Sequence, residues 1–282
     1  YYRGDEKVPL DALKQTSQDV EHFLFESNSD ILSIKAGSYY RYDLARYLSF
    51  FSKGLMFSMI SGDVNFLPEN KAIVKSRPVE VSNENNTGVI MKLDSLRHFR
   101  FINDTLAFRE KKKSIVWRGH RLSGIRDHMV NQFHDHELCD IRQVGATDRV
   151  GLGEFLSIKQ QLAYRYVLSL EGVDVATNLK FIMFSRSLCF MPAPRFETWF
   201  LEGALEAGVH YVEIDRDGSD LIEKIQYYNA HVEEAEAIID NANKHCLQFL
   251  DRKKEDLVSF LILEKFYHLT GQKKSVYAPY FC

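Results

Sequence analysis

The second half of the chain alternates short apolar runs with segments of helical periodicity, and this alternation limits the fold more than any other feature. Four runs have the length and composition of strands: 114–117, 166–170, 187–191 and 209–214. Apolar residues recur at helical spacing in 123–133, 176–185, 198–205, 232–249 and 255–267. Strands that alternate with helices form βαβ units with parallel strands and right-handed crossovers. The sequence therefore predicts an α/β fold with a parallel sheet.

The first 110 residues carry a less regular pattern. Helical spacing is present over 11–25 and over part of 39–51, and short β-like runs occupy 72–74 and 89–93. The segment 80–88 is rich in Asn, Ser and Glu and is predicted to be an exposed loop.

Bulk composition excludes several classes of function. The formal net charge is −3, with no dense basic face, so no nucleic-acid partner is expected. No run approaches the 18 or more apolar residues of a membrane span. The 4 cysteines include no CxxC pair, which favours free thiols in a reducing compartment such as the cytoplasm.

Several catalytic signatures are absent from the sequence. It contains no GxxxxGK[ST] loop, no GxSxG elbow, no HExxH and no GxGxxG fingerprint. These absences argue against a phosphatase or nucleotide hydrolase, which is one alternative reading of an α/β chain.

Two groups of residues are candidate metal ligands. The spacing of His128, His134, His136 and Cys139 does not fit a zinc site. Asp215-Arg216-Asp217 is a DxD triplet after a predicted strand, which is able to hold a divalent cation. An acidic turn before a helix is the favoured interpretation, with Asp220 and Glu223 as a capping box. No metal site is predicted.

Chemistry-bearing residues follow the predicted strands. Arg118-Gly119 ends the first strand, Glu171-Gly172 follows the second, and the turn 215–218 follows the fourth. Ligands of parallel sheets bind beyond the carboxyl ends of the strands, so these residues are the first candidates for a site.

Several blocks in this part of the chain resemble a known family. They include WRGHRLSGIRDHMV at 117–130, EGVDVATNLK at 171–180 and ETWFLEG at 197–203. In order and at fitting distances, the blocks resemble glycosyltransferase family 90 over roughly residues 90–268. The sequence is similar to bacterial members associated with lipopolysaccharide or capsule sugars.

The resemblance implies a GT-B architecture, in which two Rossmann-like domains face a cleft. It divides the chain into an N-terminal acceptor-side domain over 1–113 and a donor-binding domain over 114–254. The terminal helix and tail over 255–282 would cross back to the first domain.

The activity implied is transfer of a hexose or pentose from a UDP-sugar to a hydroxyl of a glycan acceptor, inverting and metal-independent. No cofactor is implied beyond the donor substrate. The partners are a nucleotide-sugar donor and a glycan or lipid-linked glycan acceptor. A lipid-linked acceptor would place the enzyme in peripheral contact with the inner face of the cytoplasmic membrane.

The same resemblance and the strand-end argument select the site residues. Without a metal, cationic side chains and helix N-termini hold the diphosphate. The donor-binding candidates are Arg118, Gly119, Arg126, Glu171, Gly172, Thr177, Asn178 and Lys180. Asp43 is the candidate general base, with Asp63 and Asp94 in reserve.

A second reading from another class stays open on the sequence alone. A catalytically inactive protein of the same fold would bind a nucleotide sugar or a glycan without turnover. The general base is the residue that separates the two readings, because donor binding does not require it.

Overall fold

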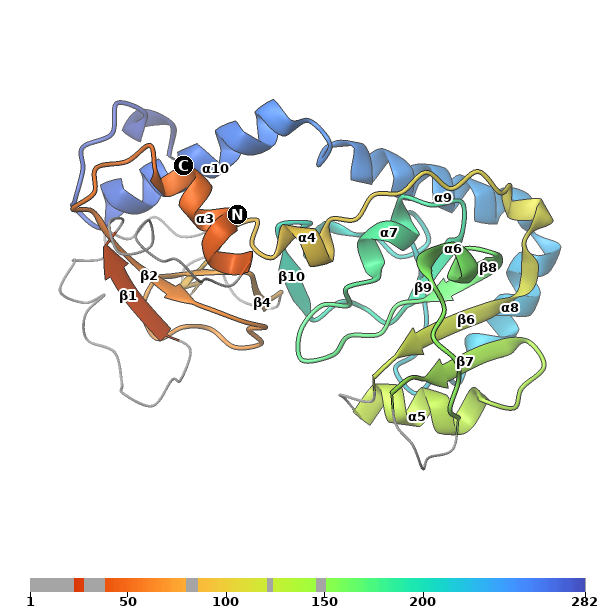
Figure 1. Ribbon diagram of the computed structural model, residues 1–282. Coiled ribbons are helices and arrows are strands. Elements are labelled where there is room, and N and C mark those ends of the chain that lie inside the picture. Colours follow the sequence, from red (N-terminus) through yellow and green to blue (C-terminus); the bar gives the residue numbers. More distant parts are fainter. Residues whose placement is uncertain (1–22, 28–38, 80–85, 121–123, 146–150, 282) are drawn as a thin grey trace. The chain divides into compact units, whose positions relative to one another are not determined.

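The computed structural model describes residues 23–27, 39–79, 86–120, 124–145 and 151–281 (Figure 1). The chain forms two compact units. Unit 1 is assembled from Tyr1–Arg97, Arg195–Gly203 and Phe249–Cys282, and unit 2 from His98–Pro194 and Ala204–Gln248.

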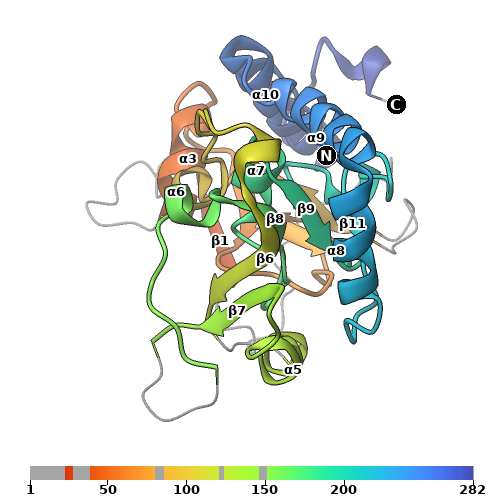
Figure 2. The same ribbon diagram turned by 90° about the vertical axis from the view of Figure 1, so that its right-hand side faces the viewer.

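Unit 2 is built on a five-stranded parallel sheet, which confirms the α/β prediction. Its strands are β6 (Lys112–Gly119), β7 (Cys139–Gln143), β8 (Tyr164–Leu168), β9 (Leu188–Met191) and β11 (Val212–Glu213). They lie in the order β11-β9-β8-β6-β7 (Figure 2). The chain runs from β6 outward to β7 and then returns to the other side of β6 to form β8. This Rossmann-like, doubly wound order creates a topological switch point between β6 and β8.

The burial of each strand reflects its position in the sheet. Every residue of the central strand β8 is buried, as expected of a strand covered on both faces. The edge strand β7 alternates buried and half-buried residues. Helices α5 (Gly124–Phe133), α8 (Leu221–Ala230) and α9 (Val232–Leu247) contribute apolar residues to one core with the strands. Two shorter helices complete the unit: α6 (Ile158–Gln161) and α7 (Leu179–Met183).

Unit 1 contains a smaller mixed sheet in the order β1-β2-β3-β5. Its strands are β1 (Phe23–Ser27), β2 (Met56–Ile60), β3 (Ala72–Val74) and β5 (Gly88–Ile90). β1 and β2 are antiparallel, and the other pairs are parallel. A separate antiparallel pair joins β4 (Ser76–Pro78) to β10 (Phe196–Thr198). The principal helices are α3 (Tyr39–Leu48) and α10 (Arg252–Leu269), with a short α4 (Ser95–His98) at the edge of the unit. None of the helices in the described part of the chain has the length and apolarity to cross a membrane.

One predicted helix is wrong, and its residues explain why. Thr198, the first residue of the predicted helix 198–205, is the last residue of strand β10. The chain then turns, and only Glu202–Ala204 form a short 3₁₀ helix. The Glu202 carboxylate accepts hydrogen bonds from the backbone N–H of Thr198 at 2.6 Å and from its hydroxyl. Leu201 has a φ of 56°, in the left-handed region. The hydrogen bonds of this buried carboxylate to Thr198 therefore stabilise a turn in place of a helix.

Other sequence predictions were wrong in part. The predicted helix 11–25 ends within strand β1, and its residues 11–22 lie outside the described residues. Residues 80–85 of the predicted loop 80–88 also lie outside the described residues. Asp220 is the N-cap residue of α8 but makes no side-chain cap bond, because its carboxylate accepts from the Asp215 N–H at 2.9 Å. Strand β7 was not predicted, and the run 209–214 contains only the two-residue β11.

A buried ion pair joins distant segments within unit 1. Arg77 on β4 and Glu197 on β10 are both completely buried. Nε of Arg77 donates to Glu197 Oε1 at 2.9 Å, and its Nη1 donates to the Gly88 carbonyl at 2.7 Å. Removing one member of such a pair leaves an uncompensated charge in a low-dielectric interior.

We therefore expect Arg77→Met to lower the free energy of unfolding by about 3–5 kcal/mol. Urea denaturation followed by circular dichroism measures the change. The matched control is Arg46→Met, which breaks the solvent-exposed pair of Arg46 with Asp256 and should cost less than about 1 kcal/mol. Equal effects of the two substitutions would contradict a special role for the buried pair.

Candidate functional site

Arg126 of α5 spans the switch point of the unit 2 sheet. Its Nη1 donates to the His120 carbonyl at 3.1 Å, just beyond the end of β6. Its Nη2 donates to the Leu170 carbonyl at 2.8 Å, just beyond the end of β8. One guanidinium therefore connects the two loops between which ligands of doubly wound sheets bind.

The surroundings of Arg126 suit an anion. Its guanidinium carbon lies 5.7 Å from the centre of the Trp117 ring, a cation–π contact. Burial lowers the pKa of Arg126, and the charge of Asp174 opposes that shift. Among the described residues, all of its hydrogen bonds go to carbonyl oxygens, and Nε has no partner. A half-buried guanidinium whose bonds are all to neutral oxygens keeps its positive charge for an anion such as phosphate.

Two predicted glycines allow this packing. A Cβ at Gly172 would lie 3.1 Å from Nη2 of Arg126, and a Cβ at Gly119 would lie 2.5 Å from the Trp117 ring. A side chain at Gly119 would have to displace the Trp117 ring, and one at Gly172 would press on the Arg126 guanidinium. Gly119 and Gly172 thus lie where the backbone closely approaches Trp117 and Arg126.

Glu171 connects β8 to the ends of two further strands. Its Oε2 accepts from Nη2 of Arg216 at 3.1 Å, and Nη1 of Arg216 donates to the Ala193 carbonyl at 3.3 Å. Arg216 follows β11, and Ala193 follows β9. The sequence argument placed Arg216 in the turn 215–218 at this edge of the sheet but did not select it as a donor-binding residue.

The carboxylates of the DxD triplet bond to the turn that contains them. Asp215 accepts from the Ser219 hydroxyl at 3.1 Å, and Asp217 accepts from the Ser219 N–H at 3.0 Å. These bonds to Ser219 hold the pKa of Asp217 below its ordinary value. The geometry is that of an acidic turn before α8.

The residues considered for zinc have separate partners. His128 bonds through Nε2 to the Asp217 carbonyl at 2.9 Å, and His134 bonds through Nδ1 to the Val130 carbonyl at 3.1 Å. Cys139 lies in the core, where burial raises its pKa to about 12. In the described part of the chain, no three His, Cys, Asp or Glu side chains are grouped to hold a metal ion.

The three remaining candidates after β8 differ in exposure. Asn178 fastens the strand end, because its Nδ2 donates to the Leu168 carbonyl at 2.9 Å and its Oδ1 accepts from the Ser169 hydroxyl at 3.2 Å. Thr177 is exposed beside it. Lys180 is completely buried in α7, with Nζ 5.9 Å from the centre of the Phe99 ring. Of the three, the Thr177 side chain is the most accessible to a ligand.

Arg118 is bonded to the edge of the sheet. Its Nη2 donates to Asp140 of β7 at 2.7 Å, its Nη1 to the Asp140 carbonyl at 2.7 Å, and its Nε to the Glu154 carbonyl at 3.0 Å. Only 7% of its side chain is exposed. These bonds hold the segment after Gly153 against β6 and β7. Donor binding by Arg118 stays a prediction.

Asp43 lies on α3 in unit 1, beside the first residue of the short helix α4. Its two carboxylate oxygens accept from the Ser95 N–H at 2.8 Å and from the Ser95 hydroxyl at 3.0 Å. Burial raises the pKa of Asp43 above the ordinary value of 3.8, although the bonds from Ser95 lower it. A carboxylate with a raised pKa is a stronger base than a solvated one.

The two reserve carboxylates lie close by in the same unit. Asp63 accepts from Tyr40 at 3.1 Å, from Arg97 at 2.6 Å and from Lys75. Although burial opposes the shift, Lys75 and Arg97 hold the pKa of Asp63 below its ordinary value.

Asp94 is 4% exposed and pairs with Arg97 at 2.6 Å. Burial raises its pKa. Its backbone φ is 53°, in the left-handed region. A non-glycine residue held in the left-handed region is uncommon and is a feature of functional sites. We call Asp43, Asp63 and Asp94 the acid cluster.

Comparison with known proteins gives the site its context. Residues 89–275 match the family described as Glycosyl transferase family 90. O-glucosyltransferase LpsA of Dichelobacter nodosus is 48% identical over 237 residues, which span 83% of this chain and 74% of that protein.

A human relative is more distant. Protein O-glucosyltransferase 3 of Homo sapiens is 25% identical over 136 residues, or 48% of this chain and 25% of that protein. The family match covers the unit 2 sheet with its switch point, and the bacterial relative covers most of the chain. The protein therefore belongs to glycosyltransferase family 90 and is a glycosyltransferase.

Proposed function

We propose that this protein transfers a glucosyl residue from UDP-glucose to a hydroxyl of a surface glycan, with lipopolysaccharide as the acceptor class. The name of the 48% identical relative supports glucose as the sugar. The observation that carries the proposal is the Arg126 guanidinium at the switch point of the parallel sheet. The reaction is inverting and metal-independent, and it takes place in the cytoplasm in peripheral contact with the membrane.

The proposal assigns donor binding to unit 2 and the acceptor to unit 1. It includes the GT-B arrangement, in which two Rossmann-like domains face a cleft that holds both substrates. The predicted domain boundaries at residues 113 and 254 remain part of the proposal.

The donor diphosphate binds at the carboxyl edge of the unit 2 sheet. The Arg126 guanidinium donates to a phosphate oxygen and neutralises the charge that develops on the leaving UDP. Helix α5 begins at Gly124 directly after the β6 loop, so its first-turn N–H groups add positive potential. Thr177 and the Glu171 carboxylate supply hydrogen bonds to hydroxyl groups of the donor.

The acceptor hydroxyl loses its proton to Asp43. The oxygen then attacks the anomeric carbon of glucose as the bond to the diphosphate breaks, and the proton remains on the Asp43 carboxyl. The raised pKa of Asp43 favours this transfer, because a base works best when its pKa approaches the working pH. Asp63 and Asp94 lie beside it and both pair with Arg97, which balances part of their charge.

We expect Arg126→Met to weaken binding of UDP-glucose by about 1.5–3 kcal/mol, because a charged hydrogen bond to phosphate is lost. The measurement is the rise in melting temperature with UDP-glucose, since a ligand of the folded state stabilises it. Arg109→Met is the matched control, because Arg109 is an exposed arginine of unit 2 paired with Glu233 and Glu236.

Two further arms test the same site. Stabilisation by UDP-glucose should survive EDTA, and loss of the shift with EDTA would reassign Asp215 and Asp217 as metal ligands. Comparison with GDP-, ADP- and CMP-sugars tests the choice of nucleotide. No shift with any nucleotide sugar at millimolar concentration would overturn the donor assignment.

We expect Asp43→Asn to lower kcat by about 10²–10⁴-fold and to leave the UDP-glucose shift unchanged, because the amide cannot accept the proton. Asp63→Asn and Asp94→Asn, measured beside it, identify the base within the acid cluster. If the unsubstituted protein binds UDP-glucose but transfers no sugar to any glycan acceptor, the inactive-protein alternative holds.

The pH dependence separates Asp43 from Asp63. A general base is active when ionised, so kcat falls as the pH drops through its folded pKa. With Asp43 as base, the acid limb of kcat should have an apparent pKa above 3.8, because burial raises it. An acid limb below 3.8 would point to Asp63, whose pKa is lowered by Lys75 and Arg97.

A further inference from the structure

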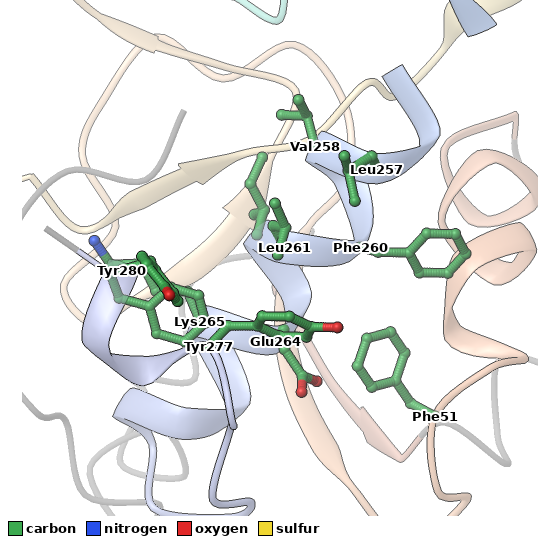
Figure 3. Close-up of a pocket in the computed structure, with 11 residues that line it drawn as sticks. Phe51, Leu257, Val258, Phe260, Leu261, Glu264, Lys265, Tyr277 and Tyr280 are labelled. Atoms are coloured by element: carbon green, nitrogen blue, oxygen red, sulfur yellow. The ribbon is translucent and has the colours of Figure 1, made fainter. Parts of the chain in front are cut away.

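Unit 1 contains an apolar groove that neither the donor site nor the acid cluster uses. Its volume is about 640 Å³, and it lies between α10, Phe51 and the carboxyl-terminal segment (Figure 3). Apolar and aromatic side chains make up most of its wall: Phe51, Leu257, Phe260, Leu261, Tyr277 and Phe281. The ring centroids of Phe50 and Phe260 are 5.2 Å apart, so Phe50 extends the same surface.

Large apolar side chains project into solvent around the groove. Tyr280 is 79% exposed, Phe50 76% and Leu257 58%. Val276 and Tyr277 are exposed beside them. We call these five residues the apolar patch. Exposed apolar side chains gathered at a groove are typical of an interaction site, and tyrosine is enriched where proteins meet the bilayer interface.

The charge around the patch is positive, although the whole chain is negative. Residues 251–281 contain six basic and four acidic side chains, whereas the net charge of the chain is −3. Five of the basic residues are exposed, namely Arg252, Lys253, Lys254, Lys273 and Lys274, whereas Lys265 is buried. Lys254 precedes Leu257 by three residues on α10, so it lies on the same helical face as the groove wall.

The four acidic side chains in this stretch are engaged within unit 1. Asp251 caps α10, and Glu255 accepts from Lys92 and Trp199. Asp256 pairs with Arg46, and Glu264 pairs with Lys273. The exposed Lys253 and Lys254 at the start of α10 therefore give this surface a positive electrostatic potential.

From the groove, the apolar patch and the surrounding cations together, we propose that this face of unit 1 docks on an anionic phospholipid bilayer. The lysines attract the headgroups, the tyrosines lie at the headgroup level, and an acyl chain enters the groove. The inference deepens the peripheral membrane contact of the proposed function, and it concerns unit 1 alone.

Vesicle flotation of the full chain tests the proposal. The vesicles are phosphatidylcholine alone, or phosphatidylcholine with an equal part of phosphatidylglycerol. We expect binding only to the anionic vesicles, and weaker binding as salt is raised. Lys253→Gln/Lys254→Gln should reduce the partition coefficient on the order of tenfold, since each lysine adds to the attraction. Leu257→Ser/Tyr280→Ser should reduce it at least as far.

Matched controls use equally exposed residues of unit 2. Phe155 is 77% exposed, so Phe155→Ser should leave vesicle binding unchanged, as should Lys159→Gln/Lys244→Gln. The melting-temperature shift with UDP-glucose, measured on every variant, shows that each is folded and tests the donor assignment separately.

Three results would overturn the proposal. The first is equal binding to neutral and anionic vesicles, and the second is an equal loss of binding in the unit 2 controls. The third is a dimer in sedimentation velocity that dissociates in Leu257→Ser/Tyr280→Ser, which would assign the groove to a second copy of the chain.

Discussion

The parallel pairing of β8 with β6 is the constraint on which the donor site depends. The chain leaves β6, forms α5 and β7 on one side, and then returns to pair β8 on the other. This reversal separates the two loops at the carboxyl edge and creates a position between them. Arg126 occupies that position and bonds to a carbonyl of each loop. Because the bonds are to neutral oxygens, they orient the guanidinium without cancelling its charge.

The sequence was sufficient for the parts of the fold that depend on local pattern. Continuous apolar runs such as 72–74 and 187–191 correspond closely to β3 and β9, because fully buried strands need apolar residues at every position. Strand β7 was missed because it alternates buried and half-buried residues in a short, polar stretch. The helix expected over 198–205 failed because the buried Glu202 carboxylate bonds the Thr198 backbone, a partner that periodicity cannot identify.

The candidate site divides in the same way. Strand-end reasoning selected Gly119, Glu171 and Gly172, because in a parallel sheet the position along the chain determines the edge. Arg126 was selected separately, as a cation able to hold the diphosphate. Neither argument could provide the partners of these residues. The pairing of Glu171 with Arg216 spans 45 residues, and that of Arg118 with Asp140 spans 22. Asp43 was chosen by resemblance, and its bonds to Ser95 depend on a fold of unit 1 that the first 110 residues do not reveal by pattern.

The segmented construction of unit 1 affects the order in which the chain can fold during synthesis. Arg77 and its partner Glu197 are 120 residues apart, and the whole of β6 to β9 is made between them. Arg77 on β4 must therefore leave the ribosome long before Glu197, whose carboxylate balances its charge, has been synthesised. Helix α10 arrives later still. Early segments of unit 1 are thus exposed to chaperones and proteases for most of translation, whereas the greater part of the unit 2 sheet can assemble as it emerges.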